Sequence, residues 1–439
     1  MSVLERVRAQ VAEMPEAVSS ERSSEVRRRL KHDLVDRLGL PAVAAMASAE
    51  SMDRARSELG VTCQAILNTH DYDEVAPSER AGLVREVLDE VVGLGPLQPL
   101  LDDESVTEVM VNGCASLYYE RAGTLVRADR LFDSSEQILT VVDRILAPLG
   151  RRLDESSPIV NARLANGYRV NAVISPVALD GPIVTIRKFS GRITSLSRLV
   201  GMGSIPAWYA QLLTWAVRAR LDVAVAGGTG SGKTTLLNAL SCEIGHGERI
   251  VTVEDSAELK FETHPHVVRL EARAASIEGK GEVTIRDLVT NALRMRPDRI
   301  VVGEVRGPEC IDMLQAMNTG HDGSLTTLHA GTADEAILRL VLMARFGMDL
   351  PTDIIEEQIA TALDLVVMGR RMPDGSRVVS EAALVRRAAA GGVDLDEVVS
   401  FDAVERSWHL VSEPAFVGDL VVQGIASSEE VAAWRSSCS

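Results

Sequence analysis

Apolar residues recur at helical spacing along the first part of the chain. The repeating positions form three stripes, at residues 4–11, 26–38 and 83–92, and glycines and a proline directly after the third stripe would end its helix. We therefore expect a helical N-terminal extension over residues 1–95. Its helices would pack against one another or dock on partner proteins.

After residue 95 the apolar pattern changes to short alternating runs. Runs such as VTEVMVNG and YRVNAVISPV are typical of strands, and Asn-Gly and Ala-Gly pairs between the runs predict turns. One helical stretch, SEQILTVVDRILAPLG, interrupts the strands. These signals predict a mixed α/β domain over residues 96–190, followed by a polar, glycine-bearing linker over residues 191–200.

Apolar strand runs alternate with helical segments over residues 201–375. This alternation predicts a second α/β unit, which favours a parallel sheet covered by helices. Residues 376–439 show short strands and helices without recognisable chemistry, so we expect a small C-terminal tail region there.

The composition, with 46% hydrophobic and 25% charged residues, is that of a folded protein. The net charge of −17 and the aromatic share of only 3% argue against direct binding of nucleic acid, which uses basic patches and aromatic stacking platforms. No run of 18 or more apolar residues occurs, and we expect the protein to be soluble.

The five cysteines are widely separated and never paired as C-x-x-C. This spacing supports neither a zinc site nor a disulfide framework, and reduced thiols indicate the cytoplasm. The cysteines are Cys63, Cys114, Cys242, Cys310 and Cys438.

The segment GGTGSGKTT carries the strongest chemical signal. It lies between the apolar strand run LDVAVA and the helical run TTLLNAL, which is the setting of a phosphate-binding loop. Its glycines let backbone N–H groups turn toward phosphates, and the positive end of the helix adds to the anion site. Lys233 would reach the β- and γ-phosphates of ATP, and the Thr234 hydroxyl would bind Mg²⁺. The nucleotide-binding candidates are Gly227, Gly228, Thr229, Gly230, Ser231, Gly232, Lys233, Thr234 and Thr235.

Two further apolar runs end in acidic residues. RIVTVED ends in Glu254 and Asp255, and DRIVVGEVRG contains Glu304. Because ligands bind at the carboxyl edge of doubly wound sheets, we expect these acids beside the phosphate loop. Glu304 would hold Mg²⁺, directly or through water, and orient the attacking water, while a carboxylate of the Glu254–Asp255 pair would polarise that water. The alternative for each acid is an ordinary charge at the end of a strand.

The segment TGHDGSLTTLHAGT contributes two histidines, His321 and His329. A histidine near the γ-phosphate could hydrogen-bond it and report hydrolysis. A purely structural role is the alternative for both residues.

Taken together, the order of these motifs resembles that of a known superfamily. GGTGSGKTT, TVEDSAEL, LRMRPDRIVVGEVRG and TGHDGSLTTLHA follow one another as in the type II/type IV secretion ATPases. The stretch LDESSPIVNARLANGYRVNAVISPVALDGPIVTIRKFS is similar to the CpaF/TadA branch, the ATPases of tight-adherence pili. The resemblance covers roughly residues 90–385. It implies an α/β fold with a RecA-like P-loop ATPase domain over residues 201–375, behind the mixed α/β domain, and assembly as a homo-hexamer.

By position, the resemblance implies catalytic roles for Glu304, Glu254, His329, Arg187 and Arg169. The two arginines fall where the family places arginines of the N-terminal domain that face the nucleotide, and a surface salt bridge is the alternative for each. Thr234 and Glu304 would hold the Mg²⁺ ion.

The chain departs from the branch at two places. Asn161 stands where the branch carries an acid, and Ala-Gly-Thr follows the histidine box where Ala-Asn-Ser is more usual. Neither change affects a phosphate or metal ligand. The four-cysteine metal motif of other pilus extension ATPases is absent, which favours the tight-adherence branch.

The sequence therefore predicts a hexameric ATPase motor that uses ATP and Mg²⁺ to drive pilus assembly or protein secretion. It would work in the cytoplasm, held at the membrane by inner-membrane platform proteins. A type IV secretion ATPase that exports DNA or protein is the alternative within the superfamily. A P-loop small-molecule kinase and a nucleotide-gated scaffold with negligible turnover are the alternatives outside it.

Overall fold

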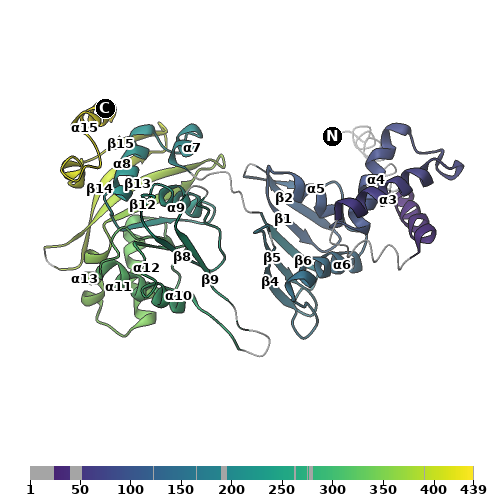
Figure 1. The fold of residues 1–439 in the computed structure, drawn as a ribbon, viewed down its shortest axis with the longest axis horizontal. Helices are drawn as coiled ribbons and strands as arrows, with labels where there is room; N and C mark the ends of the chain where they lie inside the picture. Colours follow the sequence, from purple (N-terminus) through teal and green to yellow (C-terminus); the bar gives the residue numbers. More distant parts are fainter. Residues whose placement is uncertain are drawn as a thin grey trace, which may run out of the picture. The chain divides into compact units, whose positions relative to one another are not determined.

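The computed structural model describes residues 24–39 and 52–438, except for residues 122, 165, 189–194, 262–263, 274, 276–279 and 390 (Figure 1). The helical stripe expected at residues 4–11 and the start of the expected linker, residues 191–194, lie outside this part. The chain divides into two compact units, residues 1–189 and 190–439. None of the helices in the described ranges is long and apolar enough to cross a membrane.

The first unit begins with helices that share one apolar core. A helix over residues 24–38 packs with α3 and α4, and Leu30, Leu59 and Val87 are completely buried between them. Proline occupies the first turn of α4, where its missing N–H has no helical partner in any case. The helical elements before the sheet are α3 (Met52–Leu67), η1 (His70–Tyr72), α4 (Pro77–Val91), η2 (Gly95–Leu97) and α5 (Gln98–Asp102).

A six-stranded antiparallel sheet follows, with strand order β3-β2-β1-β6-β5-β4. One helix, α6, packs on it through an apolar face that includes Ile138 and Val142. Ser134 begins this helix by accepting a hydrogen bond from the backbone N–H of Gln137 at 3.3 Å. The elements are β1 (Val106–Asn112), β2 (Ser116–Arg121), β3 (Thr124–Arg127), α6 (Ser135–Leu146), η3 (Ala147–Leu149), β4 (Ile159–Arg163), β5 (Arg169–Val173) and β6 (Ile183–Arg187).

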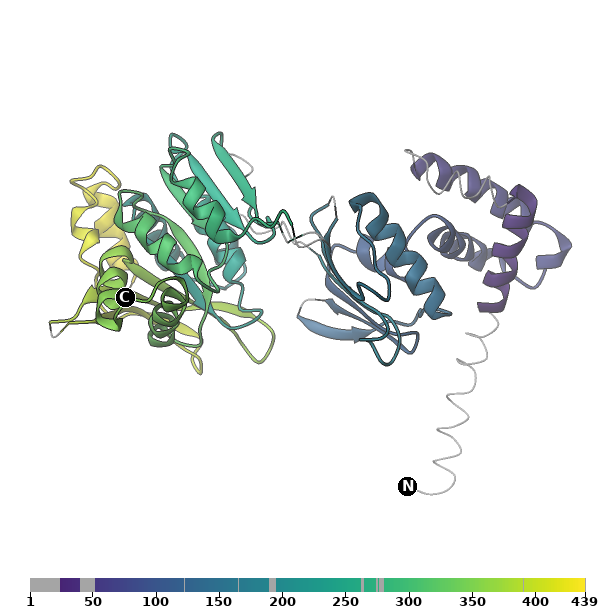
Figure 2. The same cartoon turned by 90° about the horizontal axis from the view of Figure 1, so that it is seen from below.

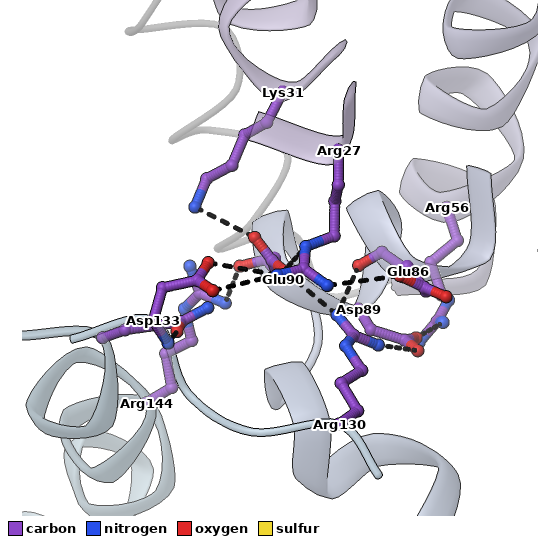
Figure 3. A network of polar contacts seen from close by, with 10 residues as sticks. Arg27, Lys31, Arg56, Glu86, Asp89, Glu90, Arg130, Asp133 and Arg144 are labelled. Atoms are coloured by element: carbon purple, nitrogen blue, oxygen red, sulfur yellow. Dashed lines mark hydrogen bonds and ion pairs between the residues drawn. The ribbon is translucent and has the colours of Figure 1, made fainter. Parts of the chain in front are cut away.

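Buried charges join the helices of this unit to the part that carries the sheet (Figure 3). Glu90 in α4 lies 2.8 Å from Arg27 Nε and 3.1 Å from Arg130 Nη2. Arg27 also pairs at 3.0 Å with Asp133, in the connection before α6. The network therefore fixes the helices against the sheet domain. Its labelled members are Arg27, Lys31, Arg56, Glu86, Asp89, Glu90, Arg130, Asp133 and Arg144.

The second unit is built on a nine-stranded sheet with the order β15-β14-β13-β12-β7-β11-β10-β8-β9. The six strands from β12 to β9 are parallel, and β13, β14 and β15 extend the sheet in antiparallel fashion. Its strands are β7 (Val223–Gly227), β8 (Ile250–Glu254), β9 (Val267–Glu271), β10 (Arg299–Val302), β11 (Leu325–His329), β12 (Leu365–Arg371), β13 (Arg377–Arg387), β14 (Val393–Asp402) and β15 (Ser407–Leu410).

Helices cover both faces of this sheet (Figures 1 and 2). Alternate residues of β7 enter opposite cores: Val223 and Val225 face α8 and α9, while Ala224 and Ala226 face α11 and α12. A parallel sheet between two helical layers is the RecA-like arrangement, so the expected fold class is confirmed. The helices are α7 (Leu196–Gly201), α8 (Ala207–Arg218), α9 (Lys233–Ser241), α10 (Ile285–Ala292), α11 (Glu309–Asn318), α12 (Ala333–Gly347) and α13 (Thr352–Ala362).

The last 64 positions, which we expected as a small tail region, are integrated into this unit. They contribute β13, β14 and β15 to the sheet, and α14 (Phe416–Asp419) and α15 (Ser428–Ser437) after it. The Trp434 indole of α15 donates to the Trp208 carbonyl of α8 at 2.7 Å, and its ring packs edge-on against Trp215. The C-terminal helix therefore completes the apolar core beside α8.

Candidate nucleotide-binding site

The phosphate loop connects β7 to α9, as the sequence predicts. Gly232, directly before α9, has a φ of 93°, a left-handed conformation that favours glycine. Gly227 is required for a different reason: a Cβ at this position would lie 2.4 Å from the carbonyl oxygen of Gly369 on the neighbouring strand β12. The loop can therefore curl over the end of β7, with the first N–H groups of α9 pointing out of the helix.

Lys233 is buried at the start of α9. Its Nζ donates to the Gly228 carbonyl at 3.1 Å and lies 3.4 Å from both ring nitrogens of His329. The ammonium is therefore held across the phosphate loop and beside the end of β11.

The parallel register brings both candidate acids to the same edge of the sheet. Strand β10 pairs with β8 and β11, and β11 pairs with β7. Glu254 ends β8, and Glu304 follows β10. A Cβ on Gly303 would come within 2.9 Å of Glu254 Cγ, so the absence of a side chain there leaves room for the Glu254 side chain beside the end of β10.

Glu254 is 2% exposed and has two unlike oxygens. Oε1 accepts the backbone N–H groups of Glu258, at 2.7 Å, and Leu259, at 2.9 Å. Oε2 is buried and has no hydrogen-bond partner in the described part of the chain. Burial raises the pKa of this carboxyl, and the two N–H donors oppose that rise only in part.

Glu304 lies between a guanidinium group and an imidazole ring. It forms an ion pair with Arg306, and its Oε1 lies 3.0 Å from His329 Nε2. Burial and the nearby Lys233 ammonium lower the pKa of His329, although Glu304 acts in the opposite direction. His329 is therefore biased toward its neutral form, which can accept or donate one proton.

The two histidines of the histidine box are separated. His329 ends β11 at the carboxyl edge, whereas His321 precedes β11, where its ring lies 3.2 Å from the Ala316 carbonyl. Asp255 is exposed beyond the end of β8. Only one histidine and one residue of the Glu254–Asp255 pair therefore lie at the centre of the site.

Comparison with known proteins identifies the family. The sequence model of the type II/IV secretion system protein family matches residues 90–388. The chain belongs to this family. The resemblance stated at the level of the superfamily is thereby confirmed, while the CpaF/TadA branch stays a prediction.

Two relatives and one solved structure are similar to this chain. A Mycobacterium tuberculosis protein named after conjugal transfer is 40% identical over 311 residues, which are 70% of this chain and 88% of that protein. The type IV secretion system protein VirB11 of Brucella suis is 33% identical over 322 residues, covering 67% of this chain and 89% of the relative. The crystal structure of the Brucella suis VirB11 ATPase in complex with sulphate aligns with 65% of this chain and 94% of its own, at 31% identity and a TM-score of 0.36.

The expected arginines of this type II/IV secretion family member lie in the first unit. Arg169 of β5 pairs in register with Arg187 of β6 on one side and with Arg163 of β4 on the other. Asn161 of β4, which replaces an expected acid, accepts a hydrogen bond from Asn171 of β5 at 2.9 Å. Three arginines thus form one row across neighbouring strands, and Asn161 has a structural partner.

The donor atoms around the loop suit Mg²⁺, which takes hard oxygen ligands and usually keeps bonds to water and substrate phosphates. The Thr234 hydroxyl at the start of α9, Glu304 and the open Oε2 of Glu254 supply such oxygens. Within the described ranges, no group of three or more His, Cys, Asp or Glu side chains could hold a metal ion by itself. A Mg²⁺ ion here would therefore complete its coordination with nucleotide phosphates and water.

Sequence reasoning missed several arginines beside the loop. Arg306 follows Glu304 by two residues and forms an ion pair with it. Arg371 and Arg377 reach the loop from the β12–β13 hairpin, and Arg377 Nε donates to the Gly230 carbonyl at 2.9 Å. Arg306 lies inside the motif DRIVVGEVRG, so the sequence could have indicated it. No local motif marks Arg371 and Arg377.

Proposed function

We propose that this chain is an ATP-hydrolysing motor of the type II/IV secretion family that works as a homo-hexamer. The observation that carries the proposal is the convergence of Lys233, His329, Glu304 and Glu254 at one edge of the parallel sheet, around the phosphate loop. The family match over residues 90–388 supports it.

In this proposal the loop N–H groups and Lys233 bind the β- and γ-phosphates of ATP and offset their charge. Mg²⁺, when bound, would add further positive charge to the same oxygens, and Thr234 and Glu304 would hold it. Glu254 would accept a proton from the attacking water, since its buried Oε2 has no protein donor and its pKa is raised. His329, beside Glu304 and Lys233, would respond to the γ-phosphate.

Arg169 and Arg187 are proposed to act on the nucleotide in the assembled ring. An arginine supplied in this way stabilises the charge that develops on the γ-phosphate and is worth roughly 10³-fold or more in related phosphoryl-transfer enzymes. Turnover per chain should then rise with protein concentration as rings form. Arg187→Ala should impair hydrolysis more than ATP binding, and specific activity that stays flat on dilution into monomers would contradict this role.

The central experiment compares wild type and Lys233→Ala for phosphate release from ATP. We expect wild type to release free phosphate and the folded variant to lose turnover, because the backbone alone leaves the phosphate charge uncompensated. If the γ-phosphate of ATP carries a label, transfer of that phosphoryl group to a small acceptor would instead support the alternative of a P-loop small-molecule kinase. Negligible release of phosphate by wild type would support the alternative of a nucleotide-gated scaffold.

For the cargo, we propose pilus assembly or secretion through inner-membrane platform proteins at the cytoplasmic membrane, in the tight-adherence branch. A second candidate, a type IV secretion or conjugation motor, is favoured by the names of the relatives from Mycobacterium tuberculosis and Brucella suis. The genes next to this one distinguish the two. Pilin and platform genes support the pilus branch, and genes of a DNA-transfer channel would support the second candidate.

A further inference from the structure

The phosphate loop lies between two halves of the parallel sheet. On one side of β7 are β11, β10 and β8, whose carboxyl ends carry His329, Glu304 and Glu254. On the other side is β12, whose Gly369 pairs with Gly227 at the start of the loop. The β12–β13 hairpin therefore continues past the loop on the side away from the acids.

Two arginines of this hairpin lie against the loop. Arg377 Nε donates to the Gly230 carbonyl at 2.9 Å, and its Cδ lies 3.4 Å from the position that a Cβ on Gly232 would occupy. Arg371 Nη1 lies 3.3 Å from the corresponding Cβ position of Gly230. Both side chains belong to exposed residues, so a ligand in the loop can reach them.

These two arginines also face each other directly, because Arg371 and Arg377 are register partners in the β12–β13 ladder. Like charges in such positions destabilise a strand pair. The turn between them is fixed from outside: Arg406 donates to Asp374 at 2.6 Å and to the Ser376 hydroxyl at 2.8 Å. The fold thus holds two cations together beside the phosphate loop, and their charge is complementary to that of a nucleotide phosphate.

We propose that Arg371 and Arg377 bind the α-phosphate and ribose end of the nucleotide, within the same chain as the phosphate loop. The γ-phosphate end is marked by Glu304 and His329 on the other side of β7, so the rest of an extended nucleotide leads toward the hairpin. Arg371 contacts the nucleotide directly, and Arg377 both contacts it and positions the loop through Gly230. This inference rests on the proposed function, since it assigns a second set of ligands to the same bound ATP.

The test measures, on the full chain, the dissociation constants of ADP and of a non-hydrolysable ATP analogue, together with kcat at saturating ATP. Arg371→Ala should weaken both ligands by the same factor, about 10-fold, because both carry the α- and β-phosphates and one charge-assisted hydrogen bond is lost. The value of kcat should stay within about twofold of wild type, since the bond is made equally in the ground and transition states. Arg371→Lys should restore part of the affinity, because it keeps the charge and loses the planar fork.

Arg370→Ala is the matched control. Arg370 is exposed and precedes Arg371 on β12, so the pleat directs its side chain to the opposite face while the charge removed is the same. Its ADP affinity should equal that of wild type. An equal loss of ADP affinity in both variants would show that the effect comes from the net charge of the chain and not from a specific contact, and would overturn the inference.

Two further outcomes would also overturn it. Unchanged ADP affinity in Arg371→Ala would remove the contact, and a loss confined to the ATP analogue and kcat would place the arginine at the γ-phosphate. If wild type binds no nucleotide, the proposed function fails and this inference fails with it. If wild type hydrolyses ATP and only the hairpin variants behave unlike the expectation, the proposed function stands.

Discussion

Glu90 and Glu254 are both buried glutamates, one in each unit, and the structure treats them in opposite ways. Glu90 faces three cations, Arg27, Lys31 and Arg130, at 2.8 to 3.3 Å. Glu254 accepts two backbone N–H groups on one oxygen and leaves the other buried without a hydrogen-bond partner in the described ranges. A buried charge that is paired on all sides joins structural elements, whereas one that is partly open is suited to a ligand.

The same contrast extends to their surroundings. The cluster around Glu90 connects three helices to the segment before α6 (Figure 3). The cluster around Glu254 gathers on one sheet edge, beside a loop that is shaped by glycines. Charge pairing alone therefore does not identify a site. Open oxygens at the carboxyl edge of a parallel sheet do.

The largest effect on stability is expected for Glu90→Gln. Loss of this carboxylate leaves three cations close together in a partly buried place, which should lower the free energy of unfolding by about 3–5 kcal/mol. Denaturation followed by circular dichroism measures this change. All four tryptophans lie in the second unit, so the transition seen by tryptophan fluorescence should hardly move.

Glu86→Gln is the control for that experiment. Glu86 pairs with the same Arg27 at 3.4 Å, but its side chain is 36% exposed, so the expected loss is below about 1 kcal/mol. Equal losses for Glu86 and Glu90 would contradict the view that the buried pairing of Glu90 holds the first unit together.

For the open site, Glu304→Gln should reduce ATP hydrolysis by about 10²-fold or more while ATP binding is retained. The amide keeps the shape of the side chain but cannot carry the charge that faces His329 and that we propose holds Mg²⁺. Phosphate release at saturating ATP measures the loss, and equilibrium binding of an ATP analogue measures what is retained. A variant that binds no ATP would show that Glu304 has a different role.

Glu254→Gln should slow hydrolysis by up to about 10²-fold, less than Glu304→Gln. It should also destabilise the chain less than Glu90→Gln, because no cluster of cations is left behind. The two measurements are phosphate release and the tryptophan-detected unfolding transition. Turnover equal to that of wild type would remove Glu254 from the catalytic residues.

Local motifs predicted much of this site. The phosphate loop, Glu254, Glu304 and His329 lie at strand ends within short segments, and parallel strands bring such ends to one edge. The sequence therefore predicted which side chains share this edge of the sheet without any knowledge of the strand order. It also predicted the alternation of strands and helices between residues 201 and 375.

The features that local motifs missed depend on distant residues. Arg377 lies 147 positions after Gly230, and only the pairing of β12 with β7 brings it to the loop. Arg27 belongs to a charged helix that resembles an exposed one, yet it is buried against acidic partners 59 to 106 positions away. Strand order and helix docking are properties of the whole fold, and a single sequence gives no direct signal for them.

A third buried carboxylate, that of Asp222, shows that burial alone does not identify a site either. Asp222 precedes β7, at the amino end of the parallel strands and thus away from the phosphate loop. It is 5% exposed, accepts the Ser324 N–H at 2.7 Å, and lies beside Asp364, whose carboxylate accepts the Asp222 N–H at 2.8 Å. Burial, with the nearby Asp364 and Asp322 charges, raises the pKa of Asp222 to about 8, and the Ser324 N–H and Arg299 oppose that rise only in part.

This pKa predicts the smallest of the effects, a pH dependence of the second unit. A carboxyl whose pKa is higher in the folded than in the unfolded chain favours folding while it is protonated. That contribution is complete below the unfolded pKa of about 4 and is lost as the pH rises through about 8. Between pH 7 and pH 8 the free energy of unfolding should fall by about 1 kcal/mol.

In Asp222→Asn, whose amide oxygen can still accept the Ser324 N–H, this fall should be absent. Urea denaturation followed by tryptophan fluorescence at both pH values, in wild type and variant, measures the difference. If wild type and variant lose the same stability between pH 7 and pH 8, other groups titrate in this range. Asp222 would then be ionised in the folded chain, which would contradict its raised pKa.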